Sequence, residues 1–429
     1  MRNRPLIAIS IWRDGSNANS LSIQFGLITI RILHLSSLYP PASIGGAEKV
    51  AAMVAQAQAA AGHEVFATSL TREPQPAGHR AGVATRPLPS RNPLWIADSA
   101  NYPAPVRLAN KVATIFNFRT AGQFGALLDD VRPDVLHTHS MVELPASVWD
   151  VARRRGIPIV HTLHDYDLLC VRAALFKDGR KCEPRHLACR VLSAAKHGPH
   201  RSIDLVAAVS QTVLDKHLEH GLFTHLPPER RHVAWNPVRF DAPTAPRTGR
   251  QPGAAFRFGY LGRVVEEKGV AALIAACRLL PAQGWSLTIA GEGPDRARFE
   301  SLAHGLPITF AGQVDAASFL AGIDTLVCLP LWDEPFGLTT LEAYAAGCRV
   351  IGTTQGVIGQ FVARVDPGWT VVPGDVAALA ATMIRAIEAD TTQNASILNS
   401  TNRLLQELQP NIVAARYIVY YEQLLASAA

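Results

Sequence analysis

Two glutamates, Glu334 and Glu342, flank a Pro-Phe-Gly turn and form the most informative motif of the chain. The turn leads into an apolar, helix-like run that ends at Gly347. A turn with free backbone N–H groups at the start of a helix binds anions well. An acid on either side can hold hydroxyl groups beside that anion. The motif therefore predicts a site for a ligand that combines an anion with hydroxyls, as a sugar nucleotide does.

Each glutamate also has a simpler explanation. Thr339, followed by Glu342 three residues later, matches a helix capping box, and Glu334 alone would be read as a solvated loop acid. Gly337 permits a backbone conformation that is closed to other residues. Taken together, the two acids around this turn favour ligand binding over two separate structural roles.

A second motif, from Gly259 to Gly269, carries two cations after an expected strand. Arg263 follows the strand end, and Lys268 directly precedes a helix-like run. Two cations in these places can neutralise a diphosphate leaving group, although either alone would be an ordinary surface cation. The segment lacks the Gly-Lys-Ser/Thr ending of a P-loop, which disfavours ATP hydrolysis.

Two glycine-rich turns are weaker signals. Gly45 and Gly46 follow the first expected strand and open a helix, where a phosphate or an acceptor could approach the backbone closely. They lack the spaced third glycine of a dinucleotide fingerprint. Gly291 and Glu292 follow another strand, and their position suggests a nucleotide contact, although the default explanation is a strand-end turn.

The segment from His161 to Asp167 ends an apolar strand with polar residues. At that end of a parallel strand we expect His164 to face the ligand and Asp165 to orient it. Alternation along a strand puts His161 and His164 on opposite faces, which argues against a shared metal ion. A histidine in this place is also often purely structural.

Length and composition indicate two cytosolic domains. The chain has 429 residues, of which 48% are hydrophobic and 18% charged, so two packed cores are the natural expectation. The six cysteines do not suggest a disulfide framework. Cys170, Cys182 and Cys189, with nearby histidines, could form a small structural zinc site, although their spacing is not a standard zinc-binding pattern. Residues 1–29 precede the first expected element and are an uncertain extension. Its apolar run, residues 6–12, is too short and too soon interrupted for a good signal peptide.

The net charge of +6 is concentrated in one place. Between Arg172 and Arg201 there are eight Lys or Arg against two acids, a local net charge of +6. This segment would suit a phosphate-bearing partner or an anionic membrane surface, or it is simply a solvated loop. We find no apolar run long enough to span a membrane. The expected location is therefore cytoplasmic, with peripheral attachment to the inner face of the cytoplasmic membrane as an option.

The expected elements alternate between strands and helices in two series, which predicts two parallel sheets covered on both faces. The strands are expected at Arg31–Ser36, Val65–Thr68, Asp134–His139, Ile157–Leu163, Leu205–Ser210, His232–Trp235, Phe258–Leu261, Ser286–Ala290, Ile308–Phe310, Thr325–Leu329 and Arg349–Gly352. The helices are expected at Glu48–Ala61, Val270–Leu280, Asp295–Leu302, Leu338–Ala346, Val376–Ala389 and Ile412–Leu425.

A proline-rich stretch, residues 241–254, reads as a linker between a first domain at 30–240 and a second at 255–405. Residues 406–429 would form a last helix that packs back toward the first domain. Ligands of such sheets bind at the carboxyl ends of the strands, so the site is expected between the domains.

At this point the chain resembles the retaining glycosyltransferases of the GT-B fold, family 4, over roughly residues 30–425. The most specific match is the Glu334–Glu342 motif. The supporting matches are Gly45-Gly46-Ala47-Glu48, His164-Asp165-Tyr166, Ala208-Val209-Ser210, Gly262-Arg263 with Lys268-Gly269, Ala290-Gly291-Glu292-Gly293-Pro294 and Phe310-Ala311-Gly312.

The resemblance implies a role for each motif. Arg263 and Lys268 would contact the donor diphosphate, with Gly291 and Glu292 also on the donor side. Glu334 would contact the donor sugar, and the backbone of Phe336, Gly337, Leu338 and Thr339 its hydroxyls and phosphate. Glu342 would hold the ribose hydroxyls and His164 would face the transferring centre. Gly45, Gly46 and Asp165 would lie on the acceptor or phosphate side.

The implied reaction transfers a sugar from a nucleotide diphosphate sugar to a glycan or lipid-linked acceptor with retention of configuration. The resemblance implies no divalent metal and no other cofactor, and no nucleic-acid partner. The chain departs from the family pattern at Asn236-Pro237-Val238-Arg239, which weakens a role for Asn236. It departs again at Pro330-Leu331-Trp332-Asp333, which would reshape the pocket for the donor sugar.

Three other functions stay open from the sequence. A UDP-sugar epimerase of the same fold would bind the donor without transferring the sugar. A non-catalytic sugar-nucleotide sensor would bind the donor without any turnover. A nicotinamide-dependent oxidoreductase is disfavoured because the spaced glycines after the first strand are missing.

Overall fold

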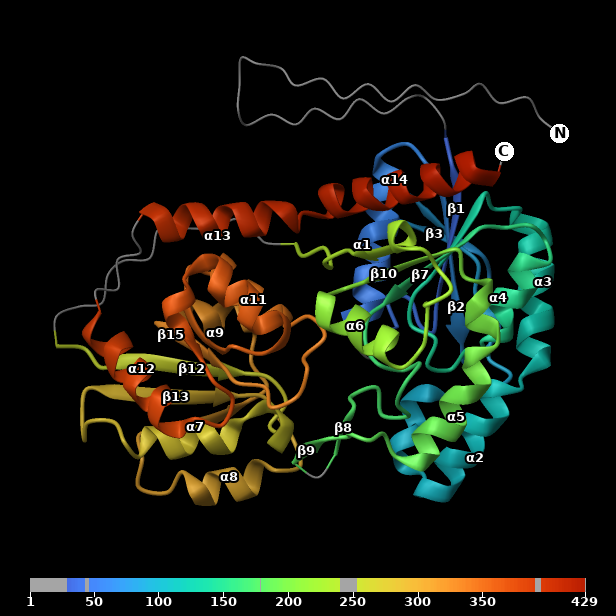
Figure 1. Cartoon of the computed structure of the whole chain (residues 1–429). Coiled ribbons are helices and arrows are strands. Elements are labelled where there is room, and N and C mark those ends of the chain that lie inside the picture. The colour runs from blue at the N-terminus through green and yellow to red at the C-terminus, as the bar shows by residue number, and fades with distance from the viewer. Residues whose placement is uncertain (1–28, 43–45, 178, 240–252, 390–394, 429) are drawn as a thin grey trace, which may run out of the picture.

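Two α/β domains lie side by side in the computed structural model, which describes residues 29–42, 46–177, 179–239, 253–389 and 395–428 (Figure 1). Each domain has a largely parallel sheet with helices packed on it, and this confirms the expected fold class. Residues 1–28 and most of the expected linker lie outside the described residues.

The sheet of the first domain is parallel except at one edge, and its strands run in the order β11-β10-β7-β6-β1-β2-β4-β3, with β5 paired to β2. Its central strands are buried along their whole length, as expected for a parallel sheet covered on both faces. The strands are β1 (Arg31–Ser36), β2 (Glu64–Thr71), β3 (Gly78–Arg80), β4 (Val83–Thr85), β5 (Leu88–Pro89), β6 (Val135–Thr138), β7 (Ile159–Leu163), β10 (Leu205–Ala208) and β11 (Arg231–Val233).

The helices of the first domain include a long one that follows the first strand and, among the described residues, five others further along the chain. They are α1 (Gly46–Ala60), α2 (Ala104–Ile115), α3 (Phe118–Val131), α4 (Ser147–Arg153), α5 (Leu187–His197) and α6 (Gln211–Glu219). A small hairpin of β8 (Phe176–Lys177) and β9 (Arg180–Lys181) leaves this domain and reaches the second one (Figure 1). The basic segment of the sequence is therefore partly a structured arm.

The second domain has a fully parallel sheet in the order β14-β13-β12-β15-β16-β17. Its strands are β12 (Phe256–Leu261), β13 (Trp285–Ala290), β14 (Ile308–Gly312), β15 (Thr325–Cys328), β16 (Arg349–Thr353) and β17 (Thr370–Val371). Its helices are α7 (Val270–Cys277), α8 (Arg296–Leu302), α9 (Ala316–Gly322), α10 (Leu338–Ala345), α11 (Gly356–Val365) and α12 (Val376–Glu388).

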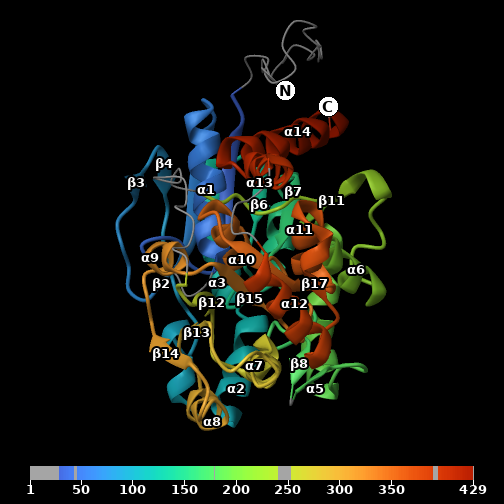
Figure 2. The same cartoon turned by 90° about the vertical axis from the view of Figure 1, so that its left-hand side faces the viewer.

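Two last helices connect the domains along one side of the molecule (Figures 1 and 2). Helix α13 (Ala395–Glu407) contacts α10 and α11 of the second domain, and α14 (Pro410–Ala428) packs on α1 of the first. Tyr417 and Tyr421 of α14 are buried in the core of the first domain together with Val50 and Val54. No helix within the described residues is both long and apolar enough to cross a membrane.

Short 3-10 turns join several of these elements, at Ile96–Asn101, Pro199–Ser202, Pro228–Arg230, Glu266–Lys268 and Pro367–Trp369. The individually expected elements omit α2 to α6, α9, α11, α13 and the short strands β3 to β5, β8, β9 and β17. Helix α2 exposes Val106, Leu108 and Val112 and buries Asn110 and Thr114, so its apolar face is turned away from the core.

Close backbone packing joins the turns that follow β12 and β13. The amide of Val264 donates to the carbonyl of Glu292 over 3.0 Å. A Cβ atom at Gly291 would lie 1.9 Å from the carbonyl oxygen of Gly262, and one at Gly293 would lie 2.1 Å from that of Val264. These glycines are therefore required for the two turns to pack together.

We predict that Gly293→Ala destabilises the second domain by about 1–3 kcal/mol, the usual cost of forcing extra atoms into a packed region. The measurement is chemical unfolding in urea. Gly322→Ala is the matched control, because nothing lies within 4 Å of the Cβ atom it would add and alanine is the better helix former. Equal stability of the two variants would contradict this packing.

Candidate functional site

The residues of the expected site follow the carboxyl ends of strands in both domains. His164 follows β7, Arg263 follows β12 and Glu334 follows β15. Because these strands are parallel within each sheet, their ends meet at the same edge. The two edges face each other where the domains touch, and this brings together motifs that lie far apart in the sequence.

Lys268 and Glu334 form the central contact on the second domain. Their Nζ and Oε2 atoms lie 2.6 Å apart, and both side chains are largely shielded from solvent. The ammonium group also lies 5.3 Å from the ring centre of Trp332, within the range of a cation–π contact. The structure therefore unites the two expected site residues, which in the absence of a ligand neutralise each other.

The start of α10 is formed by Gly337 in the left-handed conformation, with a φ of 69°. A Cβ atom here would lie 2.0 Å from Cδ1 of Ile358. No side chain caps the helix, so the capping box, the simpler explanation of Thr339 and Glu342, does not form. It fails because the helix begins at Leu338, which places Thr339 inside the first turn. The amides of that turn keep their capacity to donate to a ligand.

Phe336 anchors this turn to the protein core. Its ring is buried and packs edge-on against Phe361 at 5.4 Å between ring centres. Its side chain thus belongs to the core. This leaves only its backbone for the ligand contact that the resemblance implies.

Glu342 lies on the face of α10 that is turned toward the first domain. Its burial raises the pKa of its carboxyl group, and the positive charge of Lys49 on α1 partly offsets that rise. Gly46, at the start of α1, would place a Cβ atom 3.3 Å from Cδ1 of Leu338. The start of α1 and the start of α10 therefore approach each other closely. Gly45 lies outside the described residues.

His164 and Asp165 lie in the first domain, in the loop that follows β7. Nε2 of His164 lies 3.0 Å from Nδ1 of His139, and desolvation lowers the pKa of His164 to about 4, although the charge of Asp167 partly opposes this. Burial and the nearby Asp167 carboxylate raise the pKa of Asp165. Asp165 accepts a hydrogen bond from the amide of Asp167, whereas the ring of His164 is hydrogen-bonded to His139, so Asp165 does not directly orient that ring.

Asp333 ties the two domains together beside Glu334. Its backbone carbonyl accepts a hydrogen bond from the hydroxyl of Tyr166 over 2.9 Å. Its carboxylate lies 3.0 Å from Nζ of Lys181 on the basic hairpin and also accepts from Gln355. Tyr166, two residues after His164, thereby holds the loop after β7 against the loop that carries Glu334.

Arg263, Gly291 and Glu292 lie at the margin of this arrangement. Arg263 is exposed, and its side chain forms no ion pair with a described residue. Glu292 is exposed and pairs with Arg296 at 2.5 Å, while its backbone supports the loop of Arg263. Arg263 is therefore the cation that is free to meet an anion, and Gly291 serves the packing of the turn.

The possible zinc site at Cys170, Cys182 and Cys189 is not a close group of ligands. Cys170 and Cys189 lie with their sulfur atoms 4.0 Å apart, but the only close group of three potential metal ligands among the described residues is His34, His137 and His139. His161 forms a hydrogen bond with Thr138, and it is not part of a close group of metal ligands with His164 among the described residues.

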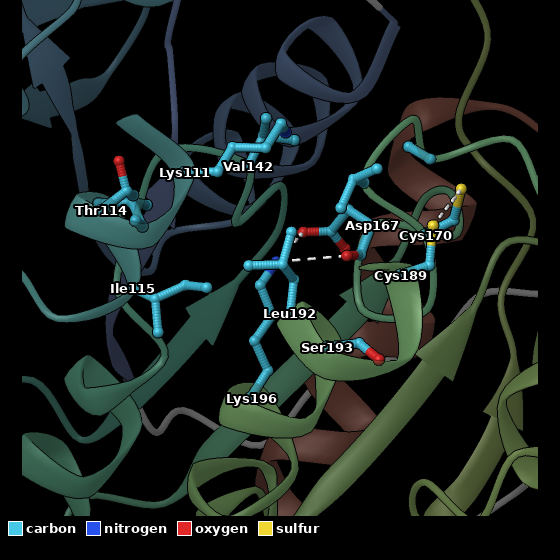
Figure 3. A pocket seen from close by; sticks show the side chains of 13 residues that line it. Lys111, Thr114, Ile115, Val142, Asp167, Cys170, Cys189, Leu192, Ser193 and Lys196 are labelled. Carbon is cyan, nitrogen blue, oxygen red and sulfur yellow. Dashed lines mark hydrogen bonds and ion pairs between the residues drawn. The ribbon is translucent and has the colours of Figure 1, made fainter. Parts of the chain in front are cut away.

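A pocket of about 50 Å³ opens beside Asp167 in the first domain, between α2 and α5 (Figure 3). Cys170 and Cys189 lie on one side, and Lys196 contacts Asp167 at 3.3 Å. The wall is mostly apolar, with Ile115, Val142, Leu144 and Leu192 among its residues. This pocket is separate from the group around Lys268 and Glu334.

Sequence reasoning missed three contributors to the site. Lys49 faces Glu342 from the other domain, Asp333 joins the domains, and His139 contacts His164. Only His139 carried a signal, because it follows an apolar strand just as His164 does. The other two depend on contacts between the domains, which no local pattern reports.

Comparison with known proteins agrees with this geometry. A family model described as "Glycosyltransferase Family 4" matches residues 44–242, and one described as "Glycosyl transferases group 1" matches residues 255–389. The chain is 29% identical to a glycogen synthase of Mycobacterium tuberculosis over 90% of this chain and 92% of that protein.

Two solved structures share the fold. Sucrose-phosphate synthase from Thermosynechococcus elongatus superposes with a TM-score of 0.70 at 21% identity, over 92% of this chain and all of that one. The Anabaena protein HepE in complex with UDP superposes with a TM-score of 0.65 at 17% identity over the same shares of the two chains. The two family models together cover most of the chain and both of its domains, and the chain belongs to the group 1, family 4 glycosyltransferases, which have the GT-B fold.

Proposed function

We propose that this glycosyltransferase moves a sugar from a nucleoside diphosphate sugar to a glycan or lipid-linked acceptor, with retention of anomeric configuration and without a divalent metal. The observation that carries the proposal is that Lys268, Glu334 and the open start of α10 lie beside a contact between the domains that Tyr166 makes from the loop following His164. A cation, free helix amides and a carboxylate that can bind hydroxyl groups are therefore gathered in one region.

The departing diphosphate would be stabilised by positive charge already in place. Arg263 and Lys268 supply two cations, and the first amides of α10 supply oriented N–H donors. Charge held in place before the reaction needs no reorganisation during it. This is the support for a mechanism that works without a metal ion.

Glu334 and Glu342 would bind the two sugars of the donor. Glu334, now paired with Lys268, would turn to the hydroxyls of the transferred sugar when the diphosphate takes over its partner. Glu342, whose pKa is raised by burial, would accept from the ribose hydroxyls. His164 would lie against the reacting sugar, and Gly46 and Asp165 would lie on the acceptor side.

UDP is bound by the structural neighbour HepE, which makes a uridine donor the first one to test. The test is a thermal-shift screen with UDP-, GDP-, ADP- and dTDP-sugars, followed by product analysis with the labelled donor that binds. We expect a labelled glycoside with the donor's anomeric configuration, formed equally well with EDTA present. An epimerised free nucleotide sugar would favour the epimerase alternative, and binding without turnover on any acceptor would favour the sensor.

We predict that Lys268→Ala and Glu334→Ala each lower kcat by about 10²–10³-fold, the usual loss when one group that stabilises developing charge is removed. The measurement is initial rate together with a thermal melt to show a folded protein. Glu300→Ala is the matched control, because Glu300 pairs with Arg296 on the exposed surface of α8. Rates near wild type in both site variants would overturn the assigned roles.

We further propose that the first domain rests on an anionic membrane through α2, α5 and the basic hairpin. Helices α2 and α5 contact each other and expose apolar side chains at Leu108, Val112, Leu187 and Val191, with Phe116 and Phe118 following α2. Exposed cations lie on the same segments at Arg107, Arg172, Arg180 and Arg190. Apolar side chains bordered by cations are typical of surfaces that bind anionic lipid.

Reversing Arg180 and Arg190 to Glu should weaken binding to anionic phospholipid vesicles at least about ten-fold, because each basic residue near such a surface contributes about 1 kcal/mol. Co-sedimentation with vesicles measures this. Arg403→Glu, on the exposed side of α13, is the control for a change in charge elsewhere. Equal binding to neutral and anionic vesicles would sink the proposal.

A further inference from the structure

A row of buried side chains runs through the first domain and ends at His164. Gln58 on α1 places Oε1 2.8 Å from Nε2 of His34 in β1. Nδ1 of His34 lies 2.9 Å from Nε2 of His139, and Nδ1 of His139 lies 3.0 Å from Nε2 of His164. Three imidazole rings are thus joined end to end by hydrogen bonds, and the glutamine closes the inner end.

Every ring in this row is neutral near pH 7. Burial lowers the pKa of His34 to about 4 and that of His139 well below its ordinary value, and it lowers the pKa of His164 to about 4. A neutral imidazole has one nitrogen that donates and one that accepts. The donor side chosen by one ring therefore determines the donor side of the next.

Gln58 has a second partner. Its amide nitrogen donates to the hydroxyl of Tyr421 over 3.2 Å, while its carbonyl oxygen faces His34. That hydroxyl in turn lies 2.6 Å from Nδ1 of His137, and Nε2 of His137 lies 2.7 Å from the hydroxyl of Thr162. Helix α14 therefore holds the position of the side chain, and the direction of the amide is decided by the other end of the row.

A carbonyl oxygen only accepts, so His34 must carry its proton on Nε2. His139 then donates from Nε2 to His34, and His164 donates from Nε2 to His139. The outer nitrogen of His164, Nδ1, is left without a proton. It is also the one atom of the row that is buried without a hydrogen-bond partner among the described residues.

We propose that Gln58, through His34 and His139, fixes the tautomer of His164 so that Nδ1 is left bare, as an acceptor for a substrate hydroxyl. Gln58 is a positioning residue, distant from the reacting atoms. A bare imidazole nitrogen accepts a hydrogen bond from a hydroxyl and disfavours another acceptor, such as a phosphate oxygen. The role of the presented nitrogen rests on the proposed function, whereas the tautomer is a property of the protein alone.

The opposite arrangement is possible in principle if the amide of Gln58 is turned over. Every hydrogen bond in the row then reverses, and His164 carries a buried N–H that has no acceptor. A buried donor without a partner is rarer than an unsatisfied acceptor and costs the desolvation of the group. The observed row therefore favours the bare nitrogen.

A metal ion is the competing use of this cluster, because His34, His137 and His139 bring nitrogens within 4.8 Å of one another. Both ring nitrogens of each of these residues already have a hydrogen-bond partner in the protein. Zinc would have to displace several of these bonds and would find no carboxylate in the group. The hydrogen-bonded row explains the cluster without such a cost.

The test is long-range ¹H–¹⁵N NMR of the full chain labelled at histidine, recorded near pH 7.5 without substrate. A bare ring nitrogen resonates far from a protonated one, and His164→Gln identifies the signals of His164. We expect His164 protonated at Nε2 and bare at Nδ1. A proton on Nδ1 in the wild-type protein would overturn the proposal, whether or not any variant folds and whether or not a donor is known.

Variants test the part played by Gln58. Gln58→Leu removes the acceptor, so we expect the His164 signals to shift toward a mixture of tautomers. Gln58→Glu keeps an oxygen facing His34 and should retain the wild-type pattern. Thr162→Val is the matched control, because it removes a buried hydroxyl beside His137 without touching the row. Unchanged His164 signals in a folded Gln58→Leu variant would contradict the role of Gln58.

Two further readings complete the experiment. With a turning-over donor, Gln58→Leu should lower kcat by about two-fold or more with a smaller change in KM, because only the competent tautomer reacts, and Gln58→Glu should restore it. One equivalent of ZnCl₂ should leave the histidine signals unchanged, whereas loss or large shifts of the His34 and His139 signals would show metal binding instead.

Discussion

The anchoring of Asp333 between the two domains is the contact on which the rest of the site depends. Tyr166 bonds to its backbone and Lys181 to its carboxylate, so the loop after β15 is held by the loop after β7 and by the basic hairpin. Glu334 directly follows Asp333, and His164 lies two residues before Tyr166. Without this contact, both residues would still follow their strands, but they would not share a site.

Charge is arranged in pairs around this contact. Lys268 neutralises Glu334 within one domain, and Lys49 lies near Glu342 across the two domains. A buried carboxylate without a partner is expensive, and the nearby cation offsets part of that cost for each acid. An anionic ligand with hydroxyl groups can replace both halves of such a pair, since its phosphate meets the cation and its hydroxyls meet the acid.

Much of the fold could be predicted because its signals are local. Buried strands such as β6 and β7 read as apolar runs, and the helices that cover them read as alanine- and leucine-rich stretches, so the alternation and the two-domain division follow from the sequence. The capping box did not form because Thr339 and Glu342 suit either the cap of a helix or its first turn. Only the backbone conformation of Gly337 shows that the helix begins at Leu338. Helix α2 was not among the predicted helices, and its apolar side chains face outward.

The candidate site was predictable residue by residue but not as an arrangement. Strand-end polar residues identified His164, Arg263 and Glu334, and the turn glycine identified the start of α10. The partners of these residues come from distant segments: Lys49 from α1, Lys181 from a hairpin, and Gln58 through two intervening histidines. Their contribution depends on tertiary contacts, and a single sequence holds no record of which distant residues will touch.

Helix α14 has a consequence for the order in which the molecule can assemble. Tyr417 and Tyr421 fill the core of the first domain and bond to groups on β6, β7 and α1, yet they follow the whole sheet of the second domain in the chain. The second domain therefore has its sheet available before these tyrosines are synthesised. The first domain leaves the ribosome first but can complete its interior only after the second domain, which reverses the usual vectorial order of domain folding during translation.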